Sequence, residues 1–147
     1  MFRGNHGDPQ GELEDLERAL AIDPNFAFAL GNRGRLRERA GDLEGALQDY
    51  ARAAELAPQS YELQTNLGAA WRTRGRPDLA LVAFDRAVAL RPDHPHPRRL
   101  RAELREHLGD LEGALRDVEQ LLERTPEHPW ALRARMRLMR AIPPRPR

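Results

Sequence analysis

The 147-residue sequence contains no cysteine and no lysine. The absence of cysteine excludes disulfides, thiolate nucleophiles and cysteine-based zinc or iron–sulfur sites. All 24 basic residues are therefore arginine, which excludes Schiff-base chemistry and a phosphate-loop lysine. Hydroxyl nucleophiles are also scarce, because the only serine is Ser60 and the chain has three threonines.

Long apolar runs are missing as well. No run approaches the ~18 residues of a membrane-spanning helix, and the N-terminus lacks the apolar stretch of a secretory signal. The 24 basic and 23 acidic residues leave a formal net charge of +1, which argues against a uniformly basic nucleic-acid binder. The sequence predicts one soluble, cytoplasmic domain, for which membrane and nucleic-acid partners are disfavoured.

Glycine and proline, with 11 and 12 residues, are placed at a fixed interval and are not scattered. Three columns of residues recur with a period of 34: Pro24, Pro58, Pro92 and Pro126; Gly7, Gly41, Gly75 and Gly109; Ala46, Ala80 and Ala114. Chance does not align this many columns, so the chain contains an internal repeat.

Each repeat carries the local signals of two helices. Gly41, Gly75 and Gly109 follow a helical stretch, where a left-handed C-terminal cap favours glycine. The expected second helices begin at N-cap Asp8, Asp42 and Asp110 or at Pro9 and Pro77, and the first helices at Asn25, Ser60, Pro95 and Pro129. We predict about eight helices in one domain over 1–142: a half repeat 7–24, full repeats 27–60, 61–94 and 95–128, and a terminal helix 129–142, with a disordered tail 143–147.

These columns resemble the tetratricopeptide repeat, whose pattern is best kept in Leu67-Gly68-x-x-Trp71, Ala80-x-x-x-Phe84 and Pro92. The resemblance covers about residues 7–142. It implies an all-α, right-handed superhelical solenoid of antiparallel helix pairs. The core would be a continuous strip between neighbouring repeats, because no single copy buries its own apolar face.

One column departs from the family pattern, which usually has an apolar residue just before the small Gly or Ala. Here that column reads Arg33, Leu67, Arg101 and Arg135, and the facing column on the second helices reads Asp49, Ala83 and Asp117. We predict the ion pairs Arg33–Asp49 and Arg101–Asp117 within their repeats. Coincidence over three copies is the alternative.

Enzyme motifs are missing: there is no serine-hydrolase, zinc-protease, phosphate-loop or dinucleotide-binding motif. The histidines do not predict a metal site, because His96 and His107 lie about 16 Å apart on one expected helix. His94 and His128 occupy the same repeat position and are interpreted as turn residues. We therefore predict a protein without catalytic residues, metal or cofactor.

The resemblance implies that the first helices line a concave face that binds an extended peptide or a partner helix. Carried over onto this chain, the candidate peptide-binding residues are Phe28, Arg35, Arg39, Thr65, Asn66, Arg72, Arg99, Glu103, His107, Trp130, Arg133, Arg137 and Arg140. One subset of the family grips a C-terminal carboxylate with a Lys/Asn set. Only Asn66 and Arg35 fit that set here, so this activity is not expected.

The last helix places Arg133, Arg137 and Arg140 on one face, with Leu132, Met136, Leu138, Met139 and Ile142 mostly on the other. One interpretation is a terminal cap with a polar outer face. Another is an anion-binding stripe for an acidic or phosphorylated segment, with Trp130 as an anchor. An anionic membrane surface is a weaker third.

The first expected helix has an apolar stripe of Leu13, Leu16 and Leu20, and no helix precedes it in the sequence to cover this stripe. Either Met1 and Phe2 fold back, or the protein self-associates there, or the chain is a fragment of a longer array. The charge is also uneven: residues 129–147 carry +6, and residues 1–128, with 18 arginines and 23 acids, carry −5.

We expect a non-enzymatic scaffold that binds a peptide or partner segment in its concave groove, an acidic one at the Arg-rich C-terminal end. The alternative is a docking or regulatory fragment of a larger multidomain enzyme or assembly factor. An RNA-binding helical repeat is a third candidate, disfavoured by the interleaved acids and by the few groove aromatics.

Overall fold

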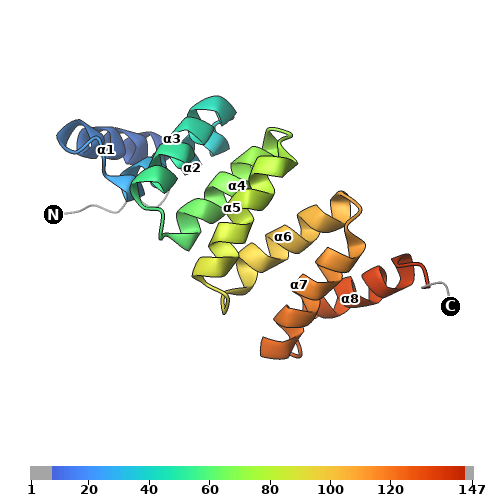
Figure 1. Ribbon diagram of the computed structural model, residues 1–147. Helices are drawn as coiled ribbons and strands as arrows, with labels where there is room; N and C mark the ends of the chain where they lie inside the picture. The colour runs from blue at the N-terminus through green and yellow to red at the C-terminus, as the bar shows by residue number, and fades with distance from the viewer. Residues whose placement is uncertain (1–7, 145–147) are drawn as a thin grey trace.

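The computed structural model describes residues 8–144, and in this range the chain forms eight α-helices and no strand (Figure 1). The helices are α1 (Pro9–Ile22), α2 (Ala27–Arg39), α3 (Leu43–Leu56), α4 (Tyr61–Thr73), α5 (Pro77–Leu90), α6 (Pro95–His107), α7 (Leu111–Arg124) and α8 (Pro129–Ala141). Each helix packs on the next one along the chain, so the molecule is an all-α solenoid with α1 and α8 at its ends.

At most helix ends the structure has the turns and caps that the sequence predicts. Gly41, Gly75 and Gly109 have φ of 85°, 71° and 83°, the left-handed conformation that an L side chain avoids. Asp42 and Asp110 cap α3 and α7 by accepting a hydrogen bond from the N–H three residues ahead. Gly7, the remaining member of the glycine column, lies outside the described residues.

The start of α2 differs from the expectation. Asn25 was expected to open this helix, but Phe26 is its N-cap and makes no capping hydrogen bond. The Asn25 N–H instead bonds the Asp23 carboxylate at 3.0 Å, which closes the turn before the helix. His94 and His128, interpreted as turn residues, are more specifically the N-caps of α6 and α8, because each ring Nδ1 accepts a backbone N–H.

The core lies between neighbouring helices along the whole array, as the repeat predicts. The alanines of the 34-residue column, Ala46, Ala80 and Ala114, are at most 2% exposed. Helices of one pair cross closely at the small residues of the first helix: a Cβ on Gly68 would lie 2.6 Å from the Phe84 ring. A bulkier residue here would push the two helices apart.

The end helices are less covered. Leu20 of α1 is buried, but Leu13 and Leu16 are only half-buried, and the expected folding back of Met1 and Phe2 lies outside the described residues. Met136, expected opposite the arginines of α8, instead lines the same hollow as Arg133 and is 56% exposed. Within residues 8–144 no helix is long and apolar enough to cross a bilayer.

Candidate functional site

The first predicted ion pair is present between α2 and α3. Arg33 donates from Nε and Nη2 to the two Asp49 carboxylate oxygens at 2.9 and 2.7 Å, a bidentate contact. Arg37, one turn further along α2, adds a bond of 2.9 Å to the same carboxylate. The Asp49 side chain is only 5% exposed, so its charge depends on these two arginines.

The second predicted pair, Arg101–Asp117, joins α6 to α7 with the same bidentate geometry. Arg105 occupies the place of Arg37 and donates to Asp117 at 2.9 Å. Arg98 is a third neighbour, since its Nη1 lies 3.7 Å from the carboxylate and donates to Gln120. Burial lowers the pKa of Arg98, although the Asp117 charge opposes that shift.

Ion pairs connect the first helices of successive repeats, α4, α6 and α8, and involve several of the candidate binding residues. Arg72 of α4 lies 3.8 Å from Glu103 of α6, and Arg99 donates to the same carboxylate at 2.8 Å. Arg137 of α8 forms a bidentate pair of 2.7 and 2.8 Å with Glu106 of α6, a residue that the candidate set omits. The hydrogen bond from Arg137 lowers the pKa of Glu106.

Trp130 lies in the first turn of α8 and contacts Arg99 of α6. The guanidinium carbon of Arg99 lies 5.1 Å from the centre of the Trp130 ring, and His128 meets the ring edge-on at 6.4 Å. Trp130 is half-buried, so part of the residue remains accessible beside these two neighbours.

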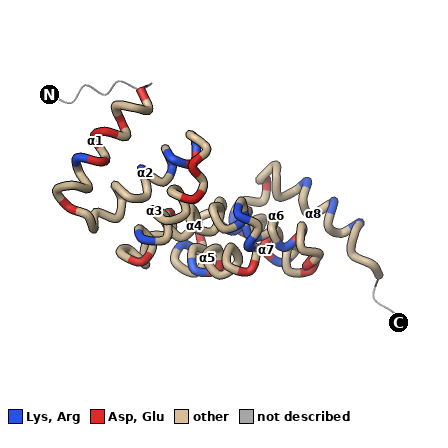
Figure 2. The backbone as a smooth tube through the Cα atoms, turned by 90° about the horizontal axis from the view of Figure 1, so that it is seen from above, with Lys and Arg blue, Asp and Glu red and all other residues tan. Residues whose placement is uncertain are grey.

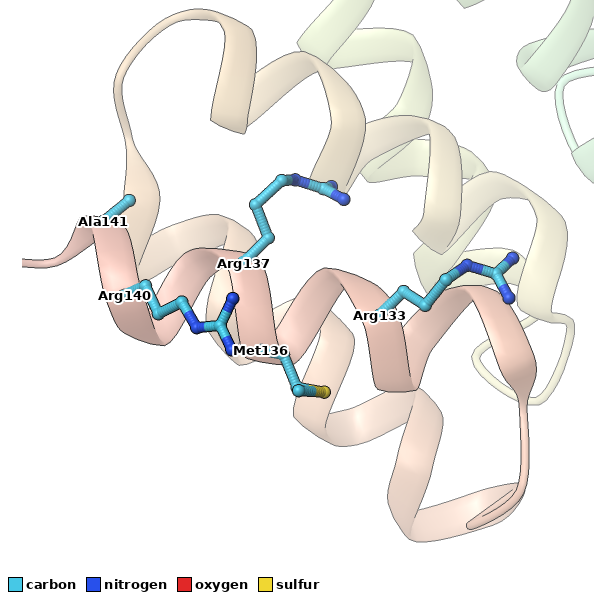
Figure 3. A pocket seen from close by; sticks show the side chains of 5 residues that line it. All are labelled: Arg133, Met136, Arg137, Arg140 and Ala141. Atoms are coloured by element: carbon cyan, nitrogen blue, oxygen red, sulfur yellow. The ribbon is translucent and has the colours of Figure 1, made fainter.

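Three of the four arginines of α8, Arg133, Arg137 and Arg140, line an open hollow of about 460 Å³ together with Met136 and Ala141. Figure 3 shows the three guanidinium groups spread along α8, with Met136 between Arg133 and Arg140. Only Arg137 has a carboxylate partner; Arg133 and Arg140 make no ion pair with any residue in the described part of the chain. The stripe therefore holds two guanidinium groups that an incoming anion could bind.

A second hollow of about 480 Å³ opens between the C-terminal ends of α4 and α6. Three candidate residues line it, Arg72, Glu103 and His107, alongside Pro77 and Leu108. Leu108 is 47% exposed, so this hollow combines a charged side with an apolar one.

The candidates nearer the N-terminus are more scattered. Phe28 is 57% exposed, and Arg35 reaches Glu12 of α1 at 3.5 Å. Arg39 lines a separate hollow of about 330 Å³ at the end of α2. Thr65 is buried and donates its hydroxyl to the Tyr61 carbonyl at 2.6 Å, so it offers no free donor, whereas Asn66 is half-buried.

Charge is distributed as the sequence suggests. Figure 2 shows basic positions and no acidic one on α8, whereas acidic positions dominate α1 at the other end. No group of three or more His, Asp or Glu side chains among residues 8–144 is placed to hold a metal ion.

Comparison with known structures gives the same architecture. MamA superposes with a TM-score of 0.85 at 21% identity, covering 96% of this chain and 85% of that one. The first TPR of Spaghetti (RPAP3) bound to the HSP90 peptide SRMEEVD gives 0.72 at 25% identity, with 78% and 91% covered. YrrB, a TPR protein with an unusual peptide-binding site, gives 0.75 at 22% identity, with 88% and 66% covered.

Family models agree with these structures. One tetratricopeptide repeat model matches residues 67–139, and a second matches 5–61 and 32–95. A search of curated proteins finds no significant match. Because the second model alone spans more than half of the sequence, and the helix pairs, caps and small-residue crossings have the expected geometry, the chain belongs to the tetratricopeptide repeat family.

Proposed function

We propose that this protein is a non-enzymatic scaffold that binds an extended segment of a protein partner along α2, α4, α6 and α8, with acidic residues of the segment at the α8 end. The observation that carries the proposal is the pair Arg133 and Arg140, which have no carboxylate partner among the described residues and flank Met136 in an open hollow. Two similar structures support it, since their names record peptide binding and one peptide, SRMEEVD, contains three acids.

The chemistry of the α8 end suits an acidic ligand. A guanidinium presents paired N–H donors that match the two oxygens of a carboxylate or phosphate. Arg137 is already paired with Glu106, so in this proposal Arg133 and Arg140 are the two arginines that bind the ligand. Trp130, held in place by Arg99, supplies an aromatic surface beside them.

The test begins with the wild-type protein and a random peptide display library, because the partner is unidentified. We expect the selected peptides to be enriched in Asp and Glu. Their affinity should fall about tenfold or more for Arg133→Glu with Arg140→Glu, measured by fluorescence polarisation at constant salt.

The matched control replaces two exposed arginines elsewhere, Arg86→Glu on α5 and Arg116→Glu on α7. It makes the same change in net charge, so it separates a local site from general attraction. Peptides without acidic enrichment, or an equal loss of affinity in the control, would contradict the proposal.

A further inference from the structure

The two ends of the array are complementary halves of a helix pair. The 34-residue period aligns α1 with the second helices α3, α5 and α7, and it aligns α8 with the first helices α2, α4 and α6. In the part of the chain that the structure describes, α1 packs on α2 and α8 packs on α7, and these helices lie at opposite ends of the solenoid (Figure 1).

On α8, the face that a second helix would cover is exposed. Met136 aligns with Gly34, Gly68 and Ala102, which are all buried, yet Met136 is 56% exposed. Met139, one turn further, is 61% exposed. Arg135 occupies the column of Arg33 and Arg101 but has no ion pair with any residue among 8–144, because no second helix presents an aspartate to it.

On α1, that missing aspartate is present. Asp15 precedes Asp49 by one period of 34 residues, and Asp49 and Asp117 are the carboxylates that bind Arg33 and Arg101. Its side chain is 77% exposed, and its one ion pair within the described chain is a 3.6 Å contact to Arg18 on the same helix. Leu16 is only half-buried, although its equivalents Tyr50, Phe84 and Val118 are at most 2% exposed.

We propose that α1 of a second copy of this chain docks on the exposed face of α8, with Asp15 of one molecule pairing with Arg135 of the other. The contact would repeat the Arg33–Asp49 and Arg101–Asp117 geometry between molecules. Charge favours it: residues 8–24 carry six acids and one arginine, whereas residues 129–144 carry four arginines and no acid (Figure 2).

Such a contact is head-to-tail, because it joins two different surfaces. Each molecule then keeps one free end, so the copies assemble into open chains, or into rings where the rotation closes. The contact is weaker than an internal one, since Glu12 replaces the alanine of α3, α5 and α7 and Met136 replaces the small residue of α2, α4 and α6. We therefore expect association that depends on protein concentration and weakens with salt.

The test is sedimentation velocity of the full chain over a range of concentrations. Asp15→Arg or Arg135→Asp alone should raise the concentration needed for association by about tenfold or more, because each brings like charges together. An equimolar mixture of the two variants should associate again in alternating order, since every contact between unlike molecules joins opposite charges. The double variant Asp15→Arg with Arg135→Asp should also associate.

Matched controls make the same charge changes on an outward column. Glu14→Arg and Arg116→Asp lie at equivalent positions of α1 and α7 and are exposed. They should leave association within about twofold of wild type, which would separate the proposed contact from general charge effects. Circular dichroism confirms that each variant keeps its helices.

A gain of association sharpens the test. Glu12→Ala with Met136→Ala restores the small residues of the third pair, Ala114 and Ala102, so it should lower the concentration needed for association. A wild type that stays monomeric throughout, a mixture that fails to associate, or controls that lose association equally would overturn the proposal. Sedimentation is measured without peptide, so the outcome is independent of peptide binding even for Met136→Ala, which changes a residue of the hollow beside Arg133 and Arg140.

Discussion

The three complete helix pairs of this solenoid have the same architecture, but the contacts between their helices differ between the two outer pairs and the middle pair. α2–α3 and α6–α7 are joined by buried aspartates held by two or three arginines, whereas α4–α5 has Leu67 and Ala83 at the equivalent positions. Both kinds of pair still place a small residue of the first helix against the second. The crossing is therefore set by the small-residue contact, and the column before it tolerates either a satisfied ion pair or an apolar pair.

The largest effect is expected where the charged pairs are most buried. Asp117→Asn removes the only carboxylate shared by Arg98, Arg101 and Arg105, whose side chains are 8%, 13% and 23% exposed. Arg101 keeps Asp85 at 2.8 Å and Arg105 keeps Asp110 at 3.8 Å, but Arg98 is left buried with no carboxylate partner among the described residues. Breaking a buried charge pair in this way is costly, so we expect a loss of about 3 kcal/mol in the free energy of unfolding. Urea denaturation measures it, with exposed Glu119→Gln on the same helix as the control. A loss no greater than that of the control would show that the cluster is not important for stability.

The middle pair should instead be sensitive to volume. Gly68→Ala places a methyl group 2.6 Å from the Phe84 ring, and we expect a loss of about 1–2 kcal/mol after the gain in helix propensity. The third pair carries Ala102 opposite Val118, so Phe84→Val should make room. Thermal unfolding of the four combinations should give a double variant that loses less than the sum of the single ones. Additive losses would contradict a direct contact between positions 68 and 84.

The apolar residues of the middle pair, Leu67 and Ala83, can also be introduced at the equivalent positions of the first pair, Arg33 and Asp49. Arg33→Leu leaves the buried Asp49 with Arg37 as its remaining partner, and we expect a loss of about 2 kcal/mol. Adding Asp49→Ala removes the buried carboxylate that Arg37 alone compensates, and Arg37 is 28% exposed and keeps its 4.0 Å contact to Asp42. The double variant should therefore return to within about 1 kcal/mol of wild type in urea denaturation. A double variant less stable than Arg33→Leu alone would show that the ion pair itself is required for this crossing.

Much of this fold was predictable because the same local signals recur in each repeat of the sequence. Gly41, Gly75 and Gly109 report the same turn three times, and Arg33–Asp49 recurs as Arg101–Asp117, so each position confirms another. Asn25 was misassigned because a local capping signal competes with the Asp23 turn, and propensity does not rank the two.

The candidate site was harder to predict, because side-chain pairing between repeats has no fixed spacing. Helical periodicity placed Arg133, Arg137 and Arg140 on one face, but it could not show that Glu106 holds only the middle one. Met136 was assigned to the apolar face because it is hydrophobic, yet its spacing of three residues from Arg133 and four from Arg140 places it on the face of these arginines. It is exposed there because no helix of the described structure covers it.

The smallest expected effect concerns the exposed Arg137–Glu106 pair, which contrasts with the buried ones. The Arg137 hydrogen bond lowers the pKa of Glu106 from its ordinary value of 4.5, so the ionised form is favoured in the folded protein. The contribution of this pair to the free energy of unfolding is therefore complete above that ordinary value and is lost as the pH falls through the lowered pKa.

Arg137→Gln should raise the pKa of Glu106 toward 4.5, as followed by an NMR titration of its carboxyl carbon. The free energy of unfolding at neutral pH should fall by only about 0.2–1 kcal/mol, because Arg137 is 53% exposed and solvent screens the pair. Arg133→Gln is the matched control, and it should leave that titration unchanged; an unchanged titration in Arg137→Gln would show that the pair does not form in solution.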